Sequence, residues 1–161
     1  CVKTLLENLK SVNPDAKILY TASRITLEEE REIKGRRVLV VEDGPTLTHG
    51  GMSYGAGVIA AKRHGAELVK PGPYAKGSIK EILDSYHYLT ELIPAMGYSK
   101  AQIKDLEDTI NSTPCDLVLI ATPVNLGRII KINKPTVRVR YEVEEMGRRG
   151  IKEMVEEFIK S

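Results

Sequence analysis

The sequence predicts an α/β fold with a mainly parallel sheet and helices on both faces, Rossmann-like and three-layered. Residues 37–41 and 116–121 are near-continuous aliphatic runs, the pattern of strands buried on both faces of a parallel sheet. Helical patterns, with apolar residues three and four positions apart, lie between the strand patterns. Such alternation is typical of parallel α/β sheets. With 161 residues, 42% of them hydrophobic, the chain suits one ordinary core.

The first part of the chain shows one helix and one strand. Residues 2–12 carry apolar side chains at helical spacing, and Asn13 and Pro14 end that pattern. Residues 16–22 are predicted to form a strand, and residues 27–33 form either a short acidic helix or a loop. The join near residue 34 is weak, so residues 1–34 could belong to a different unit from an α/β domain over 35–161, or both could pack together.

The remaining elements follow in order from residue 35. Ser99 and Gln102 have the spacing of a capping box, which starts a helix with Ile103, Leu106 and Ile110 on one face. Residues 89–94 are ambiguous. The other expected elements are strands at 37–41, 67–69, 116–121 and 136–141, and helices at 54–64, 78–86, 125–130 and 151–159.

Composition excludes several classes of protein. A net charge of +2 is too balanced to indicate nucleic-acid binding. No apolar stretch approaches the ~20 residues of a membrane span. Cys1 and Cys115 form neither a zinc pattern nor a disulfide framework, which fits a reducing, cytoplasmic setting.

Abundant Lys and Glu hint at a thermophile. Because the chain begins with Cys1, it is expected to be processed or to be a piece of a longer protein.

One loop is unusually rich in small polar residues: VEDGPTLTHGGMSYGAG, residues 41–57. It leaves a buried strand and enters a helix, and ligands of open α/β sheets bind at the carboxyl ends of strands. Its hydroxyls and glycine amides suit phosphate oxygens, and Glu42 and Asp43 suit Mg²⁺. The alternative is a long turn with a capped helix, with His49 at the surface. The chain has no Walker A sequence. The candidate phosphate-binding residues here are Thr46, Thr48, Gly50, Gly51, Gly55 and Gly57.

Three further positions are candidates for anion binding. Thr122 follows the second strong strand, where it either faces a ligand or only caps a short helix. Ser78 opens a helix and could hold a phosphate. Arg138 and Arg140 share one face of the last strand, because side chains alternate along a strand. They need either an anionic ligand or acids of the fold as partners, and the sequence favours neither.

Several segments together resemble the archaeal and bacterial predicted GTPases related to cyclic 2,3-diphosphoglycerate synthetase. They are residues 38–52, 54–57, 94–98, 113–116, 130–135 and 137–142. The resemblance implies a longer protein with a Rossmann-like region and a P-loop NTPase core before this part. Residues 2–22 then resemble the last helix and strand of that core, with Ala22 and Ser23 near the nucleotide base.

The resemblance also implies a function. This chain would be the C-terminal domain of an NTP-dependent phosphoryl-transfer enzyme, a ligase, with His49, Arg138 and Arg140 as catalytic residues. Its substrate would be a phosphorylated small molecule, and ATP or GTP with Mg²⁺ would bind mainly to the missing NTPase domain. The fragment alone is expected to be inactive. Gly72, Asn125 and Gly127 stand where the family carries arginine, aspartate and arginine.

Two alternatives remain open beside this function. One is a non-catalytic regulatory or partner-binding module of a predicted GTPase. The other is an α/β domain whose loops are only structural. The nucleotide preference and the formation of a homodimer are also left open.

Overall fold

The computed structural model describes residues 2–28, 33–97, 99–147 and 150–160. It divides into two compact units. Unit 1 comprises Cys1–Arg24 and Glu142–Ser161, and unit 2 comprises Ile25–Tyr141. The sequence suggested a join near residue 34, whereas the contacts group the two ends of the chain together. Of the segment 27–33, which could be a helix or a loop, residues 29–32 lie outside the described residues.

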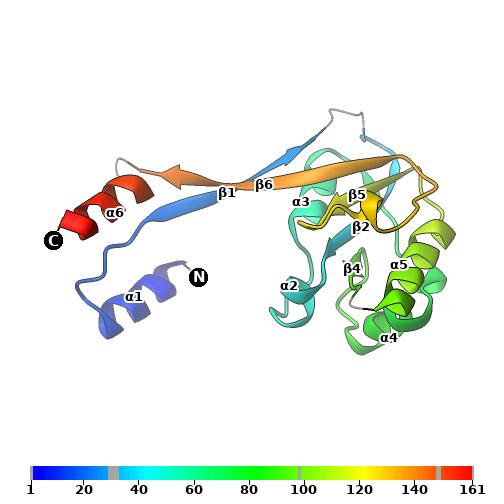
Figure 1. The fold of residues 1–161 in the computed structure, drawn as a ribbon, viewed down its shortest axis with the longest axis horizontal. Helices are drawn as coiled ribbons and strands as arrows, with labels where there is room; N and C mark the ends of the chain where they lie inside the picture. The colour runs from blue at the N-terminus through cyan, green and yellow to red at the C-terminus, as the bar shows by residue number, and fades with distance from the viewer. Residues whose placement is uncertain (1, 29–32, 98, 148–149, 161) are drawn as a thin grey trace. The chain divides into compact units, whose positions relative to one another are not determined.

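The sheet has six strands in the order β1-β6-β5-β2-β3, and β4 also pairs with β2 (Figure 1). The central strand β2 runs parallel to β3, β4 and β5, and β5 runs parallel to β6. The predicted mainly parallel sheet is therefore confirmed. The strands are β1 (Tyr20–Leu27), β2 (Arg37–Asp43), β3 (Glu67–Leu68), β4 (Ile93–Ala95), β5 (Leu117–Ala121) and β6 (Thr136–Met146).

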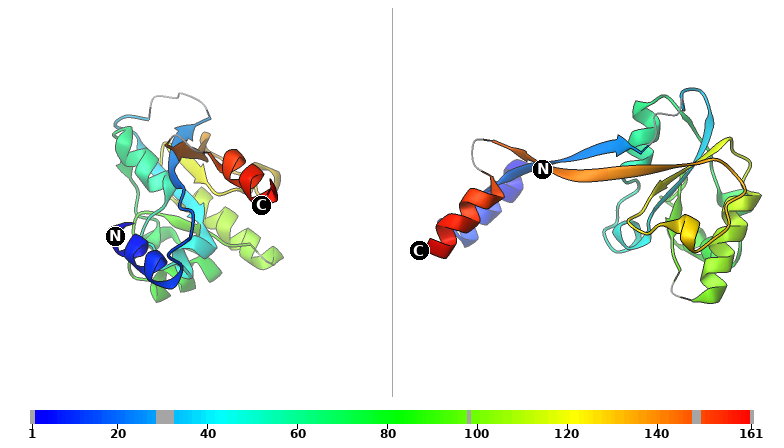
Figure 2. Two further views of the ribbon diagram at one scale, coloured as in Figure 1. Left: turned by 90° about the vertical axis from the view of Figure 1, so that its left-hand side faces the viewer. Right: turned by 45° about the horizontal axis from the view of Figure 1, so that its top comes forward.

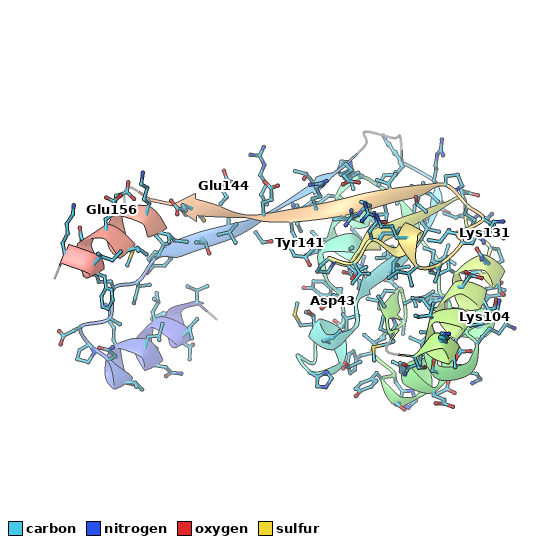
Figure 3. All side chains as sticks on the ribbon, viewed as in Figure 1. Asp43, Lys104, Lys131, Tyr141, Glu144 and Glu156 are labelled. Atoms are coloured by element: carbon cyan, nitrogen blue, oxygen red, sulfur yellow. The ribbon has the colours of Figure 1, made fainter. Side chains whose placement is uncertain are left out.

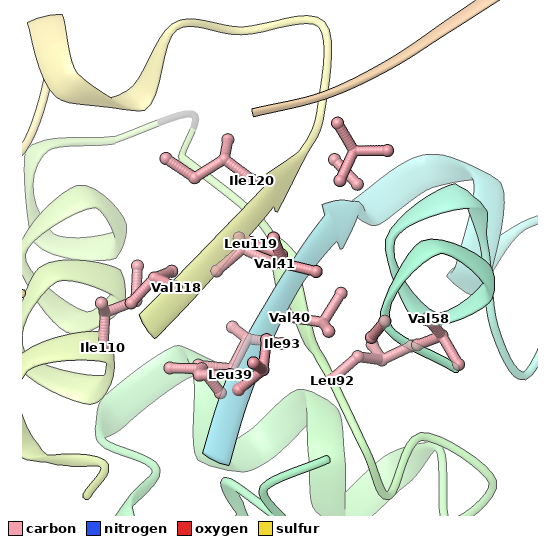
Figure 4. Close-up of a cluster of buried hydrophobic side chains, with 14 of the residues drawn as sticks. Leu39, Val40, Val41, Val58, Leu92, Ile93, Ile110, Val118, Leu119 and Ile120 are labelled. Atoms are coloured by element: carbon pink, nitrogen blue, oxygen red, sulfur yellow. The ribbon is translucent and has the colours of Figure 1, made fainter. Parts of the chain in front are cut away.

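Helices cover both faces of the sheet in unit 2, which confirms the three-layered architecture. Val58 of α3 and Ile110 of α5 lie on opposite sides of β2 and β5 (Figure 4). Figure 2 shows the helices and strands of unit 2 from two further directions. All five residues of β5 are buried, as expected of a strand covered on both faces. The helices of unit 2 are α2 (Gly44–Thr48), α3 (Ala56–Arg63), α4 (Gly77–Ser85) and α5 (Lys100–Ser112), with 3₁₀ turns η1 (Gly72–Tyr74) and η2 (Leu126–Arg128).

Unit 1 contains the two terminal helices, α1 (Val2–Val12) and α6 (Ile151–Lys160), both confirmed in type and place. Neither helix has a buried residue. Lys17 Nζ donates to Glu157 Oε2 at 2.9 Å, which ties the segment before β1 to α6. All of the buried hydrophobic side chains lie between Ile33 and Val139, so the core of the described chain belongs to unit 2.

The observed elements differ from the predicted ones where tertiary pairing decides. The strand predicted at 16–22 is wrong in its bounds, because β1 spans Tyr20–Leu27 beside β6. β6 itself continues to Met146, five residues beyond the predicted end. The ambiguous stretch 89–94 leads into the short strand β4, which pairs with the end of β2. The five-residue helix α2 inside the polar loop was not predicted.

Among the described residues, no helix is both long and apolar enough to cross a bilayer.

Candidate functional site

The carboxyl ends of β2 and β5 meet at one edge of the sheet in unit 2. Glu42 lies opposite Ala121 in the register of these strands, so Asp43 and Thr122 are the first residues beyond the paired segment. Arg138 of β6 lies opposite Ile120 of β5. Asp43 at the end of β2 and Thr122 just after β5 line one pocket, and Arg138 Nη2 lies 3.5 Å from the carbonyl oxygen of Pro123, the residue after Thr122. We call this place the carboxyl edge, defined by Asp43, Thr122 and Arg138.

Glu42 is buried, with 3% of its surface exposed, and its carboxylate caps helix α3. Its Oε1 accepts hydrogen bonds from Gly55 N at 3.1 Å and from Val58 N at 3.0 Å. These are amides at the start of a helix, which have no partner within the helix. Burial raises the pKa of Glu42, and the backbone hydrogen bonds partly oppose that rise.

The close packing of Glu42 explains two of the loop glycines. A Cβ on Gly55 would lie 2.5 Å from Glu42 Oε2, and a Cβ on Gly57 would lie 2.6 Å from Val40 Cγ1 and 2.8 Å from Ala121 Cβ. Side chains have no room at either position. The alternative of a turn with a capped helix thus describes this half of the loop. Phosphate binding by Gly55 and Gly57 and Mg²⁺ binding by Glu42 stay predictions. The structure shows other roles for these residues: the two glycines allow close packing, and Glu42 caps the helix.

The other half of the loop forms α2 and the turn that follows it. Thr46 Oγ1 donates to Asp43 Oδ2 at 2.8 Å, and Thr48 Oγ1 donates to Gly44 O at 3.0 Å. His49 is exposed at the end of α2, with Nδ1 3.0 Å from Thr48 Oγ1. Gly50 and Gly51 are exposed in the turn. The hydroxyls therefore already have partners within the fold.

Ser78 lies away from this loop, at the start of α4. Its backbone N and its Oγ both donate to Asp105 Oδ2 at 2.9 Å. These two hydrogen bonds lower the pKa of Asp105. The carboxylate thus fills the place that the sequence suggested for a phosphate.

The two predicted arginines form an ion-pair network with Glu28, a partner that the sequence did not reveal. Arg140 Nε donates to Glu28 Oε1 at 2.8 Å, and Arg138 Nη1 lies 3.9 Å from the same oxygen. The sequence left open whether acids of the fold or a ligand would partner these arginines, and the structure supplies the acid. Arg138 Nη2 reaches Pro123 O at 3.5 Å. Among the described residues, the Arg138 Nε is a buried side-chain nitrogen without a hydrogen-bond partner.

A pocket of about 170 Å³ opens beside the carboxyl edge. Asp43 and Thr122 contribute its polar groups, and among the described residues that line it Asp43 carries the only formal charge. Its apolar lining includes Met96, Ile103, Leu106 and Leu126. Sequence reasoning missed these residues, although the apolar side chains in 94–97 and 126–130 could have indicated a lined cavity.

Tyr141 was also missed as a neighbour of the site. It lies on β6 near Asp43 at the end of β2 (Figure 3). Partial burial raises the pKa of Tyr141, and the carboxylates of Asp43 and Glu42 raise it further. Its phenol is therefore a neutral hydrogen-bonding group at this edge near neutral pH.

Two expectations fall outside this site. Ala22 and Ser23, proposed for the nucleotide base, belong to unit 1. Within the described ranges, no group of three or more His, Cys, Asp or Glu side chains could hold a metal ion. Cys115 is a free, half-buried thiol that packs against the core, and burial raises its pKa.

Comparison with known proteins relates the chain to part of a synthetase. No protein-family model matches it, and no solved structure matches it. Arginine synthetase ArcE from Thermococcus kodakarensis is 52% identical over 161 residues, which cover 99% of this chain and 36% of the relative. The chain thus spans about a third of the length of this curated relative. The relative bears a synthetase name, as the family resemblance implied, but the name specifies arginine instead of cyclic 2,3-diphosphoglycerate.

Proposed function

We propose that this chain is the C-terminal, substrate-binding domain of an NTP-dependent synthetase, a ligase. The observation that carries the proposal is the 52% identity with arginine synthetase, which extends along nearly the whole chain. Identity at this level over both units supports a shared fold. ATP or GTP with Mg²⁺ would then bind mainly to the rest of the longer protein, since this chain carries no Walker A sequence.

The pocket supports arginine, or a close analogue, as the substrate or product held here. A basic amino acid has an aliphatic stem, a cationic end and a carboxylate. The apolar lining suits the stem, and Asp43 suits the cation.

A phosphorylated substrate, as in cyclic 2,3-diphosphoglycerate synthetase, is the weaker candidate. It would need several cations together, whereas Arg138 and Arg140 already share Glu28 and the described pocket residues include no cation. The amides at the start of α3 and α4 are also occupied, by Glu42 and Asp105.

Calorimetric titration of the chain with arginine, norleucine and 2,3-diphosphoglycerate tests the proposal. We expect arginine to bind and norleucine, which lacks the cationic end, to bind at least roughly tenfold more weakly. The variant Asp43→Asn should weaken arginine binding by a similar factor. Asp84→Asn is the matched control, because Asp84 pairs with Lys80 on α4 and does not line the pocket.

The outcomes separate the candidate functions. Binding of 2,3-diphosphoglycerate without arginine would favour the phosphorylated substrate. Failure of both ligands to bind would favour the non-catalytic regulatory module, whose support is the capped state of α3 and α4.

In the full-length protein, Arg138→Ala or His49→Ala should abolish NTP-dependent product formation, and unchanged turnover in both variants would contradict their catalytic assignment.

A further inference from the structure

Unit 1 has two helices whose apolar faces lie uncovered. In α1 the exposed fractions are 63% for Val2, 59% for Leu5, 40% for Leu9 and 85% for Val12. These positions fall on one side of a helix, as residues three and four apart do. Helices in globular proteins gain most of their stability from burying such a face. α1 therefore has the apolar face of a helix that packs against a partner, but it has no buried residue.

The same situation occurs at the other end of the chain. In α6 the exposed fractions are 47% for Ile151, 49% for Val155, 80% for Phe158 and 76% for Ile159. Shallow apolar depressions adjoin this helix, lined by Leu19, Met154 and Phe158 among others. Contiguous exposed apolar surface of this kind marks an interaction site in soluble proteins. We name the exposed residues of α1 and α6 together the terminal apolar surface.

The length of the relative indicates what covers this surface. The chain accounts for 36% of arginine synthetase, so almost two thirds of that protein lies outside the matched region. Both terminal segments of this chain belong to unit 1, so any continuation of the polypeptide would meet unit 1 before unit 2. In unit 2, by contrast, the core is closed, with buried side chains from Ile33 to Val139.

We infer that the terminal apolar surface is the docking site for the remainder of the synthetase, the part that carries the nucleotide. This inference rests on the proposed function. The occupant is an apolar face of that remainder. It packs on α1 and α6 and buries the apolar side chains that unit 1 leaves exposed. A second copy of this chain is the competing occupant.

Hydrogen exchange in the intact arginine synthetase, compared with exchange in this chain alone, tests the inference. Peptides that cover α1 and α6 should exchange rapidly in this chain and at least about tenfold more slowly in the matching segments of the intact relative. Peptides that cover α5 are the internal control, because α5 packs within unit 2 and should be protected equally in both proteins. Equally fast exchange of the terminal helices in both proteins would overturn the inference.

The mass of this chain in solution decides between the occupants. Light scattering should show a monomer over a wide range of protein concentrations. In a separate fluorescence measurement, a hydrophobic dye should bind to the terminal apolar surface. Leu9→Glu and Phe158→Glu should each reduce dye binding, whereas the neighbouring charge reversals Lys10→Glu and Lys160→Glu should not. A dimer that these two apolar variants dissociate, and the charge reversals do not, would show a second copy as the occupant and overturn the inference. Arginine binding at the carboxyl edge is measured separately and is unaffected by either result, so failure of the docking inference leaves the proposed function distinguishable.

Discussion

At the scale of single residues, Glu42 links the polar loop to the sheet. Its carboxylate is buried and accepts from two amides of the following turn and helix. Removing the side chain in Glu42→Ala would leave Gly55 N and Val58 N without their acceptor. We expect a loss of about 1–3 kcal/mol in the free energy of unfolding, measured by urea denaturation. A loss below this range would mean that water replaces the carboxylate at both amides.

Glu42 also makes stability depend on pH. Its pKa in the folded chain is raised above the ordinary value of 4.5, mainly by burial. The folded state therefore binds its proton more tightly than the unfolded state does, so the stability contributed by protonated Glu42 is present below pH 4.5 and is lost as pH rises through the raised pKa. Urea denaturation of the wild-type chain and of Glu42→Gln over this range should show the wild type losing stability relative to the variant. A difference between the two that does not change with pH would contradict the raised pKa.

At the scale of elements, helix α3 packs so closely on the sheet that only glycine fits at its second residue. A Cβ at Gly57 would meet Val40 and Ala121 at 2.6 Å and 2.8 Å. Gly57→Ala should therefore destabilise unit 2 by about 1–3 kcal/mol, the usual cost of overpacking, as measured by thermal or urea denaturation. Gly72→Ala is the control, because a Cβ there has no atom of the described chain within 4 Å. Equal stability of both variants would show that α3 shifts freely on the sheet.

At the scale of the whole molecule, the two units differ in how much they bury. Leu106 in α5 is 2% exposed, whereas Leu9 in α1 is 40% exposed. Leu106→Ala should cost about 2–5 kcal/mol, the range for a buried leucine, and Leu9→Ala should change the stability of the isolated chain by less than about 0.5 kcal/mol. Urea denaturation of the two variants checks this contrast. A comparable loss in both would mean that α1 is packed in solution and would contradict an uncovered surface.

Sequence patterns are enough to predict the fold class and most elements of unit 2. Aliphatic runs become β2 and β5 because only a doubly covered strand buries every side chain, and the capping box at Ser99 and Gln102 forms as its spacing predicts. The candidate loop was also placed correctly at the carboxyl end of β2, because chain order alone puts it there. Local patterns suffice to locate these features along the chain, since the aliphatic runs and the cap each lie within a few consecutive residues.

The partner of each polar group, in contrast, depends on how the whole chain packs. Glu28 lies more than a hundred residues before Arg140, and Asp105 lies 27 residues after Ser78, so no local pattern could pair them. The bounds of β1 likewise depend on β6, which arrives from the far end of the chain. The pocket, too, combines side chains from β2, β4 and α5 with residues of the loops, and Asp43 is the one carboxylate among its described lining residues. Contacts across long separations set the chemistry of the carboxyl edge, because burial and partner choice belong to the packed chain as a whole.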